Sequence, residues 1–168
     1  DKVADIDAAL AGARDIIAER LSESAKVRET LRGIFRTRRV VSKATKSGRE
    51  SADAQKFQGY FDYSEPLSRI AAHRLLAMLR GGEAGWLSVK IDADAEKCGN
   101  KLYYDFCQER RYPAGKLAEQ IRMAVDDAYK RLLEPSITTE ILKEAKQKAD
   151  QDSIVVFGEN LKQLLLAS

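Results

Sequence analysis

The sequence has few of the residues that build disulfide frameworks, metal centres and turn-rich folds. Its 168 residues include only two cysteines, one histidine, three prolines and ten glycines. Cys98 and Cys107 cannot supply a disulfide framework or a tetrahedral zinc site, and such sparse cysteine fits a reducing compartment. The low glycine and proline content argues against an all-β sandwich or a disordered linker. We therefore expect no metal, no cofactor and a cytoplasmic location.

Long hydrophobic runs are absent as well. The longest apolar stretches, such as Leu164–Ala167, are far shorter than the ~20 residues that cross a bilayer, so we expect a soluble protein without membrane contact. The N-terminus, Asp1-Lys2-Val3, has neither the basic nor the apolar region of a signal peptide. It also lacks an initiator methionine, from which we expect a segment of a longer protein.

The net charge of +3 conceals a strongly basic stretch. Residues 26–56 contain ten Lys or Arg against three acids, a local charge of +7, and the remainder of the chain carries −4. One interpretation is that this stretch attracts a polyanion. The other is a solvated surface whose cations pair with acids of the C-terminal half. The cations placed at the candidate nucleic-acid site are Arg36, Arg38, Arg39, Lys43, Lys46 and Arg49.

The spacing of apolar residues predicts a mainly α fold. Steps of three and four predict helices over 3–21, 27–35 and 117–132, the second capped by Ser22 or Ser24. Ser64-Glu65-Pro66 predicts a further helix start, and Gly81-Gly82 a helix stop. Helix breaks or starts are also expected at Pro113, at 134–136 and at Asp152. β-Branched residues predict a short strand over 40–45, followed by a turn at Ser47-Gly48. Alternation of apolar and polar residues predicts a second strand over 86–92.

These elements predict a helical bundle with a small two-stranded β insertion. We divide the sequence into an N-terminal helical hairpin or arm (1–36), a helix–strand insertion with an aromatic cluster (37–92) and a C-terminal helical bundle (93–168). In the insertion, Phe57, Tyr60, Phe61 and Tyr63 fall at helical spacing. This spacing favours an aromatic knot against the core over a platform for stacking nucleobases.

No constellation of residues predicts an enzyme. His73 is the single histidine, and no Gly-x-Ser-x-Gly motif accompanies it. Gly81-Gly82-x-x-Gly85 follows a predicted helix and precedes a predicted strand, the wrong order for cradling a phosphate. We expect His73 and Arg74 to be structural. His73 should make a capping or core hydrogen bond, and Arg74 should reach carboxylates or free carbonyls around 62–65. His73→Ala should therefore lower thermal stability.

One long pattern does carry a family signature. The segments Lys56-Phe57-x-x-Tyr60-Phe61-Asp62-Tyr63-Ser64-Glu65-Pro66 and Ile70-x-x-His73-Arg74, with the run Ala128–Ile137, resemble the central region of the Tex family of bacterial transcription accessory proteins. The sequence departs from the family at Ala71-Ala72, where Pro-Ser is usual, which removes a helix cap. The structural motif positions are Phe57, Tyr60, Phe61, Glu65, Pro66, His73, Arg74, Arg80 and Gly81.

The resemblance implies a helical region that precedes an RNase H-like domain in a nucleic-acid-binding protein. The OB-fold that carries most of the family's nucleic-acid affinity has no counterpart in this sequence. The first hypothesis is therefore a non-catalytic scaffold of a Tex-like RNA-binding protein, with weak or absent binding of RNA or single-stranded DNA by this segment. The second is a protein-interaction module that docks transcription or ribosome-associated proteins.

Overall fold

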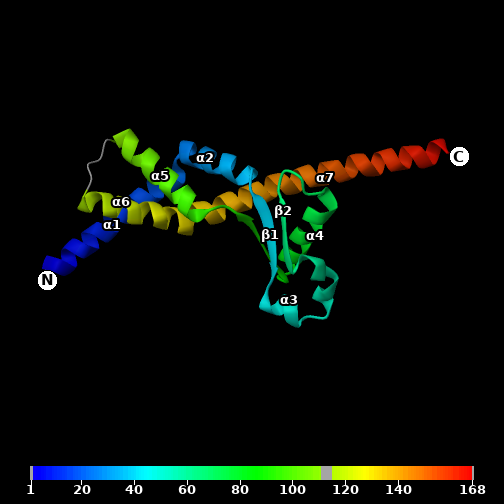
Figure 1. The fold of residues 1–168 in the computed structure, drawn as a ribbon, viewed down its shortest axis with the longest axis horizontal. Coiled ribbons are helices and arrows are strands. Elements are labelled where there is room, and N and C mark those ends of the chain that lie inside the picture. Colours follow the sequence, from blue (N-terminus) through cyan, green and yellow to red (C-terminus); the bar gives the residue numbers. More distant parts are fainter. Residues whose placement is uncertain (1, 111–114, 168) are drawn as a thin grey trace. The chain divides into compact units, whose positions relative to one another are not determined.

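The computed structural model describes residues 2–110 and 115–167, and Figure 1 shows its elements along the chain. The helices are α1 (Lys2–Glu23), α2 (Ala25–Arg36), α3 (Lys46–Glu50), the 3-10 helix η1 (Asp53–Tyr60), α4 (Ala72–Glu83), α5 (Ala95–Arg110), α6 (Lys116–Asp127), the π-helix η2 (Ala128–Leu133) and α7 (Glu134–Leu166). The strands are β1 (Arg39–Ala44), β2 (Asp62–Pro66) and β3 (Leu87–Asp92). The predicted mainly α class is confirmed.

The sheet has three strands in the described part of the chain, so the predicted two-stranded insertion is wrong. Its order is β2-β1-β3, and both pairings are antiparallel. The missed strand is β2, which we had predicted as the start of a helix because of Ser64-Glu65-Pro66. Pro66 is compatible with β2 because the strand lies at the edge of the sheet and ends there, where a missing N–H costs little.

The described chain divides into two compact units. The first combines residues within 1–34 and 93–139, and the second combines 35–92 and 140–168. The three segments predicted from the sequence follow chain order, whereas each unit joins two stretches that are distant along the chain. In the first unit, for example, α6 and η2 follow the sheet in the sequence but pack against α1, which precedes it.

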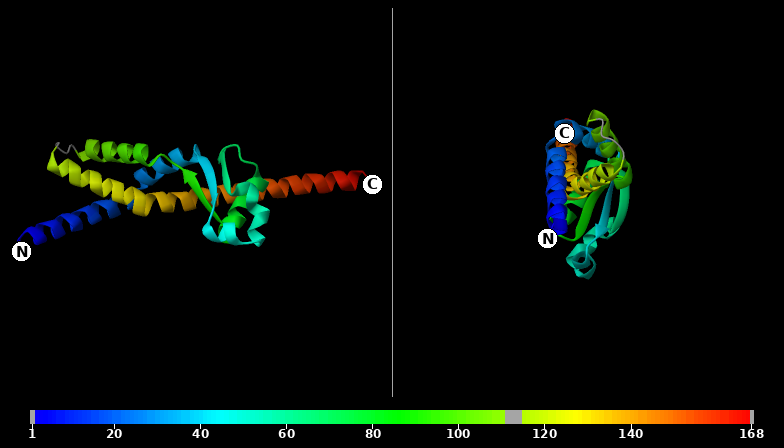
Figure 2. Two further views of the ribbon diagram at one scale, coloured as in Figure 1. Left: turned by 60° about the horizontal axis from the view of Figure 1, so that its bottom comes forward. Right: turned by 90° about the vertical axis from the view of Figure 1, so that its left-hand side faces the viewer.

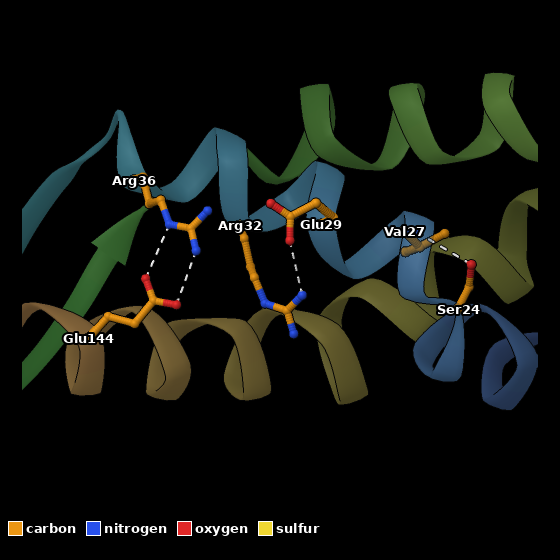
Figure 3. A network of polar contacts seen from close by, with 6 residues as sticks. All are labelled: Ser24, Val27, Glu29, Arg32, Arg36 and Glu144. Atoms are coloured by element: carbon orange, nitrogen blue, oxygen red, sulfur yellow. Dashed lines mark hydrogen bonds and ion pairs between the residues drawn. The ribbon is translucent and has the colours of Figure 1, made fainter.

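In the first unit, α1 packs against α6 and η2, and α5 runs beside α6 (Figure 2). The predicted stripe of α6 is largely correct, because Ile121, Val125 and Ala128 are buried while Leu117 is half exposed. Leu21, Leu31 and Leu102 are buried as well. Burying each large aliphatic side chain favours the fold by about 1.5–3 kcal/mol. Ser24 caps α2 as predicted, with its Oγ accepting from Val27 N–H at 3.4 Å (Figure 3).

The predicted break at 134–136 is wrong, because helical structure continues from α6 through η2 into α7. Glu134 N–H donates to Tyr129 O, five residues back, which is the π-helical spacing. Pro135 is the second residue of α7, and its missing N–H falls directly after the π-helical turn, where the regular hydrogen-bond ladder is already interrupted. Asp152, predicted to cap a separate helix, lies inside α7. The helix start predicted at Pro113 lies outside the described residues.

The second unit packs helices against one face of its sheet. Val40 and Ser42 are fully buried, whereas Arg39 and Lys43 are exposed on the opposite face of β1. The helix α4 contacts β3, and Gly81 makes this approach possible, since a Cβ there would lie 2.5 Å from Leu87 Cδ1. Gly81 therefore lies in the last turn of α4, and the helix ends at Glu83, one residue beyond the predicted stop at Gly81-Gly82.

Apolar residues near both ends of the chain are exposed. Val3 and Ile6 on α1, and Ile154, Phe157 and Leu164 on α7, are each more than half exposed. Figures 1 and 2 show no other element of the second unit beside the last part of α7. No helix in the described ranges is long and apolar enough to span a membrane.

Candidate nucleic-acid interface

The register of the sheet places charged side chains in rows across its open face. In one row Arg39 lies between Pro66 on β2 and Asp92 on β3, and in another Lys43 lies between Asp62 and Ser88. Directly opposite residues of an antiparallel pair have Cβ atoms about 4.5–5.5 Å apart, so each cation faces an acid across one strand pair. The open face of the sheet is therefore a mixed-charge surface and not a purely basic one.

Two of the predicted cations are held by other groups. Arg36 forms a bidentate ion pair with Glu144 of α7, with Nε–Oε2 and Nη2–Oε1 distances of 3.1 Å (Figure 3). Arg39 donates from Nε to Ser64 Oγ at 2.8 Å and from Nη2 to Ser64 O at 2.7 Å. For Arg36, the interpretation that acids of the C-terminal half neutralise the basic stretch is correct.

Arg38 lies between α2 and β1 in a more enclosed position. Its Nε is buried without a hydrogen-bond partner among the described residues, and its carbonyl oxygen accepts from Leu67 N–H at 2.9 Å. Substituting this side chain would therefore disturb packing as well as charge, so Arg38 is a poor position at which to test phosphate binding.

The remaining predicted cations lie at and beyond the end of β1. Lys43, Lys46 and Arg49 are exposed, and none of the three forms an ion pair within residues 2–110 and 115–167. The sequence predicted a turn here, but the segment is the short helix α3. Thr45 caps it by accepting from Gly48 N–H at 3.0 Å.

Hydrogen bonds hold α3 against the loop before β3. Thr45 N–H donates to Trp86 O at 3.0 Å, and the hydroxyls of Thr45 and Ser47 donate to Gly85 O at 2.7 and 3.1 Å. Gly48 is buried against the same backbone, and a Cβ there would overlap the carbonyl oxygen of Trp86. The cations of α3 are thus carried on a fixed support.

Aromatic side chains lie beside this support. Phe57 packs against Trp86 with ring centroids 5.6 Å apart, and the Lys56 ammonium lies 5.2 Å from the Trp86 ring centroid. The second aromatic pair is Tyr60 and Tyr63, in edge contact at 5.4 Å. The predicted single aromatic knot is therefore two pairs of partly buried residues. Tyr63 lies on the strand β2 and not on the predicted helix.

The sequence pointed to Lys56 only as part of the basic stretch, and it did not associate Trp86 or Lys90 with the candidate site. Lys90 joins the open sheet face because the register places it opposite Val41, between the rows of Arg39 and Lys43. The alternation of Ser88, Lys90 and Asp92 was the available signal. We call Lys43, Lys46, Arg49, Lys56, Phe57 and Trp86 the α3 surface.

The family motif forms a structural network elsewhere in the second unit. Arg74 of α4 donates to both carboxylate oxygens of Glu65, at 3.0 and 2.8 Å, and the Tyr63 hydroxyl donates to Glu65 Oε2 at 2.7 Å. These hydrogen bonds, from Arg74 first and Tyr63 second, lower the pKa of Glu65. They raise the pKa of Tyr63 and of Arg74. Arg74 thus reaches a carboxylate within 62–65, as predicted.

Other motif residues have separate positions. His73 is exposed in the first turn of α4, and its side chain makes no hydrogen bond to the described residues, so the expected core or capping bond is wrong. The helix begins at Ala72, and His73 lies on its exposed side. Arg80 is exposed and donates to Leu76 O at 3.3 Å. No group of three or more His, Cys, Asp or Glu in the described ranges could hold a metal ion.

Comparison with known proteins identifies the family. Residues 1–157 match the family described as Tex central region-like. The chain belongs to this family. Its Tex central region is 33% identical over 170 residues to the transcriptional accessory protein Tex of Neisseria gonorrhoeae, covering 100% of this chain and 22% of that protein. It is 33% identical over 158 residues to the uncharacterized protein YdcI of Bacillus subtilis, covering 94% of this chain and 22% of that protein.

A human relative extends the comparison beyond bacteria. The Tex central region is 26% identical over 170 residues to S1 RNA-binding domain-containing protein 1 of Homo sapiens, covering 94% of this chain and 17% of that protein. The chain therefore spans about a fifth of the length of the relatives it matches.

Proposed function

We propose that this chain is a non-catalytic helical scaffold within a Tex-like, RNA-binding transcription accessory protein. The family match over residues 1–157 is the observation that carries the proposal. The relatives' names add support, since one is a transcriptional accessory protein and another carries an S1 RNA-binding domain. Neither Cys98 nor Cys107 forms a disulfide among the described residues, and such sparse cysteine fits a reducing compartment such as the cytoplasm.

The ionic groups support a structural role over catalysis. Glu65 is held by Arg74 between β2 and α4. A hydrogen bond from Arg131 lowers the pKa of Asp127 one helical turn away. The pKa of Asp94 is lowered first by a backbone N–H of Lys97 in the first turn of α5. Each of these carboxylates is therefore kept ionised by a group that fixes a helix or joins two elements.

The α3 surface is the part of this scaffold that we propose to contact a phosphate backbone. It carries Lys43, Lys46, Arg49 and Lys56, and it excludes Arg36 and Arg39, which are held by Glu144 and Ser64. Such contacts position a nucleic acid without selecting its sequence. Binding should be weak, and four phosphate contacts on a single strand would give a log–log salt slope of about −3, at ~0.7 per phosphate.

The test replaces Lys43, Lys46 and Arg49 together with Gln and measures binding of a labelled single-stranded RNA over a salt series. The magnitude of the salt slope should fall by about 2, because three contacts are lost. A matched control replaces Lys116, Lys130 and Lys148, which are exposed on other helical segments, and should leave affinity and slope unchanged. Equal behaviour of the two triple variants would remove the α3 surface from any nucleic-acid path.

A protein-interaction module is the alternative function, and the exposed apolar residues of α7 favour it. Phe157, Leu164 and Leu165 are each about 70% exposed, and apolar side chains gathered on one helix segment commonly mark a surface for a partner. Transcription or ribosome-associated proteins are the proposed partners. Docking alone predicts no salt-dependent RNA binding by this chain, so the same titration separates the two functions.

A further inference from the structure

A small hollow lies where α1, α2 and α5 meet in the first unit. Its volume is about 80 Å³. Its apolar floor is formed by Leu21, Leu102 and Phe106, all of which are at most 8% exposed. A hollow of this size holds several waters, and it is smaller than the pockets of about 300–1,000 Å³ that take drug-sized ligands and cofactors. It is therefore suited to a single inserted side chain.

Cations surround this floor. Arg20, Lys26 and Arg110 line the hollow from three different helices. The Arg110 guanidinium is stacked over the Phe106 ring, 4.2 Å from its centroid, which places a positive charge directly beside the apolar floor. Among the described residues the lining holds one acid, Asp105, which forms an ion pair with Lys101 at 3.0 Å. Arg20 and Arg110 therefore give the described part of the lining its positive charge.

Apolar floor and cationic rim together define the chemistry of an occupant. An apolar side chain of medium size, such as Leu, would gain from burial against Leu21 and Leu102. Carboxylates on either side of it would pair with Arg20 and Arg110. A nucleic-acid phosphate would use the rim but gain nothing from the apolar floor, so the charge and the floor together favour a protein ligand.

We propose that this hollow is a docking site for an acidic segment of a partner protein, which inserts one aliphatic side chain between two carboxylates. This inference does not rest on the proposed nucleic-acid function, because the α3 surface belongs to the second unit. Failure of either proposal leaves the other in place.

The test titrates the ¹⁵N-labelled chain with a blocked Asp-Leu-Glu peptide and follows backbone amide shifts. Shifts should concentrate in residues 20–30 and 102–110. A blocked Asn-Leu-Gln peptide should bind about tenfold more weakly because two ion pairs are lost. A blocked Asp-Ser-Glu peptide should lose at least about tenfold because the buried aliphatic group is gone.

Two variants connect the shifts to the hollow. Arg20→Gln with Arg110→Gln should weaken the Asp-Leu-Glu peptide about tenfold, whereas the matched pair Lys116→Gln with Lys130→Gln should not. Thr30→Phe, which fills the hollow from α2, should abolish binding, and the amide spectrum reports whether that variant folds. Equal affinity for the leucine and serine peptides, or equal shifts with inorganic phosphate or single-stranded RNA, would overturn the proposal.

Discussion

Replacing Gly48 with Ala should be among the most damaging small substitutions in this protein. A Cβ at Gly48 would overlap Trp86 O and lie 2.9 Å from the Trp86 carbonyl carbon. Both atoms are backbone, so no side chain can rotate away. Moving the loop also strains the 3.0 Å bond from Thr45 N–H to Trp86 O. Overpacking of about 1–3 kcal/mol and one lost hydrogen bond of about 1 kcal/mol give a total of about 2–4 kcal/mol.

The assay is urea unfolding followed by fluorescence, because Trp86 is the single tryptophan of the chain and lies at the perturbed contact. Gly59→Ala is the matched control in the same unit, since a Cβ there meets nothing within 4 Å. It should leave stability unchanged or raise it by up to about 1 kcal/mol. If Gly48→Ala were as stable as Gly59→Ala, the backbone of Trp86 would not prevent a side chain at position 48.

Three further predictions concern titration and burial. Glu65→Gln should destabilise the protein at neutral pH and match the wild type in acid. The lowered pKa of Glu65 stabilises the fold fully above the ordinary pKa of 4.5, and this stability is lost as the pH falls through the pKa of the folded protein. A constant difference in urea midpoint at every pH would contradict this. Burial raises the pKa of Tyr129, and its buried hydroxyl has no hydrogen-bond partner among the described residues. Tyr129→Phe should therefore change the free energy of unfolding by less than about 1 kcal/mol, whereas Leu133→Ala should lower it by about 2–5 kcal/mol; equal losses from the two substitutions in thermal melts would contradict this. His73→Ala should stay within about 0.5 kcal/mol of wild type, since His73 is exposed; a clear drop in melting temperature would support the structural role expected from the sequence.

The pairing of Arg74 with Glu65 illustrates how far the candidate site could be predicted. The position of Arg74 at a predicted helix start indicated a contact with carboxylates or carbonyls around 62–65, and Arg74 pairs with the Glu65 carboxylate at 2.8 Å. The basic stretch was also evident from composition, but composition did not indicate which of its cations pair with other groups. Pairing of Arg36 with Glu144 joins residues 108 positions apart, and no local pattern reports such a contact.

The sequence by itself determined the helices of the first unit, the strands β1 and β3 and the family, because apolar periodicity and long motifs are local properties of the chain. Tertiary structure alone decided β2, which has little strand character and exists because β1 offers it a partner. It also decided the continuity of α6, η2 and α7 through Pro135, where packing of Tyr129 and Leu133 outweighs a helix-breaking signal. Which cations remain open on α3, and which are neutralised, follows from contacts between distant residues, since charge pairing depends on separation in space and not along the chain.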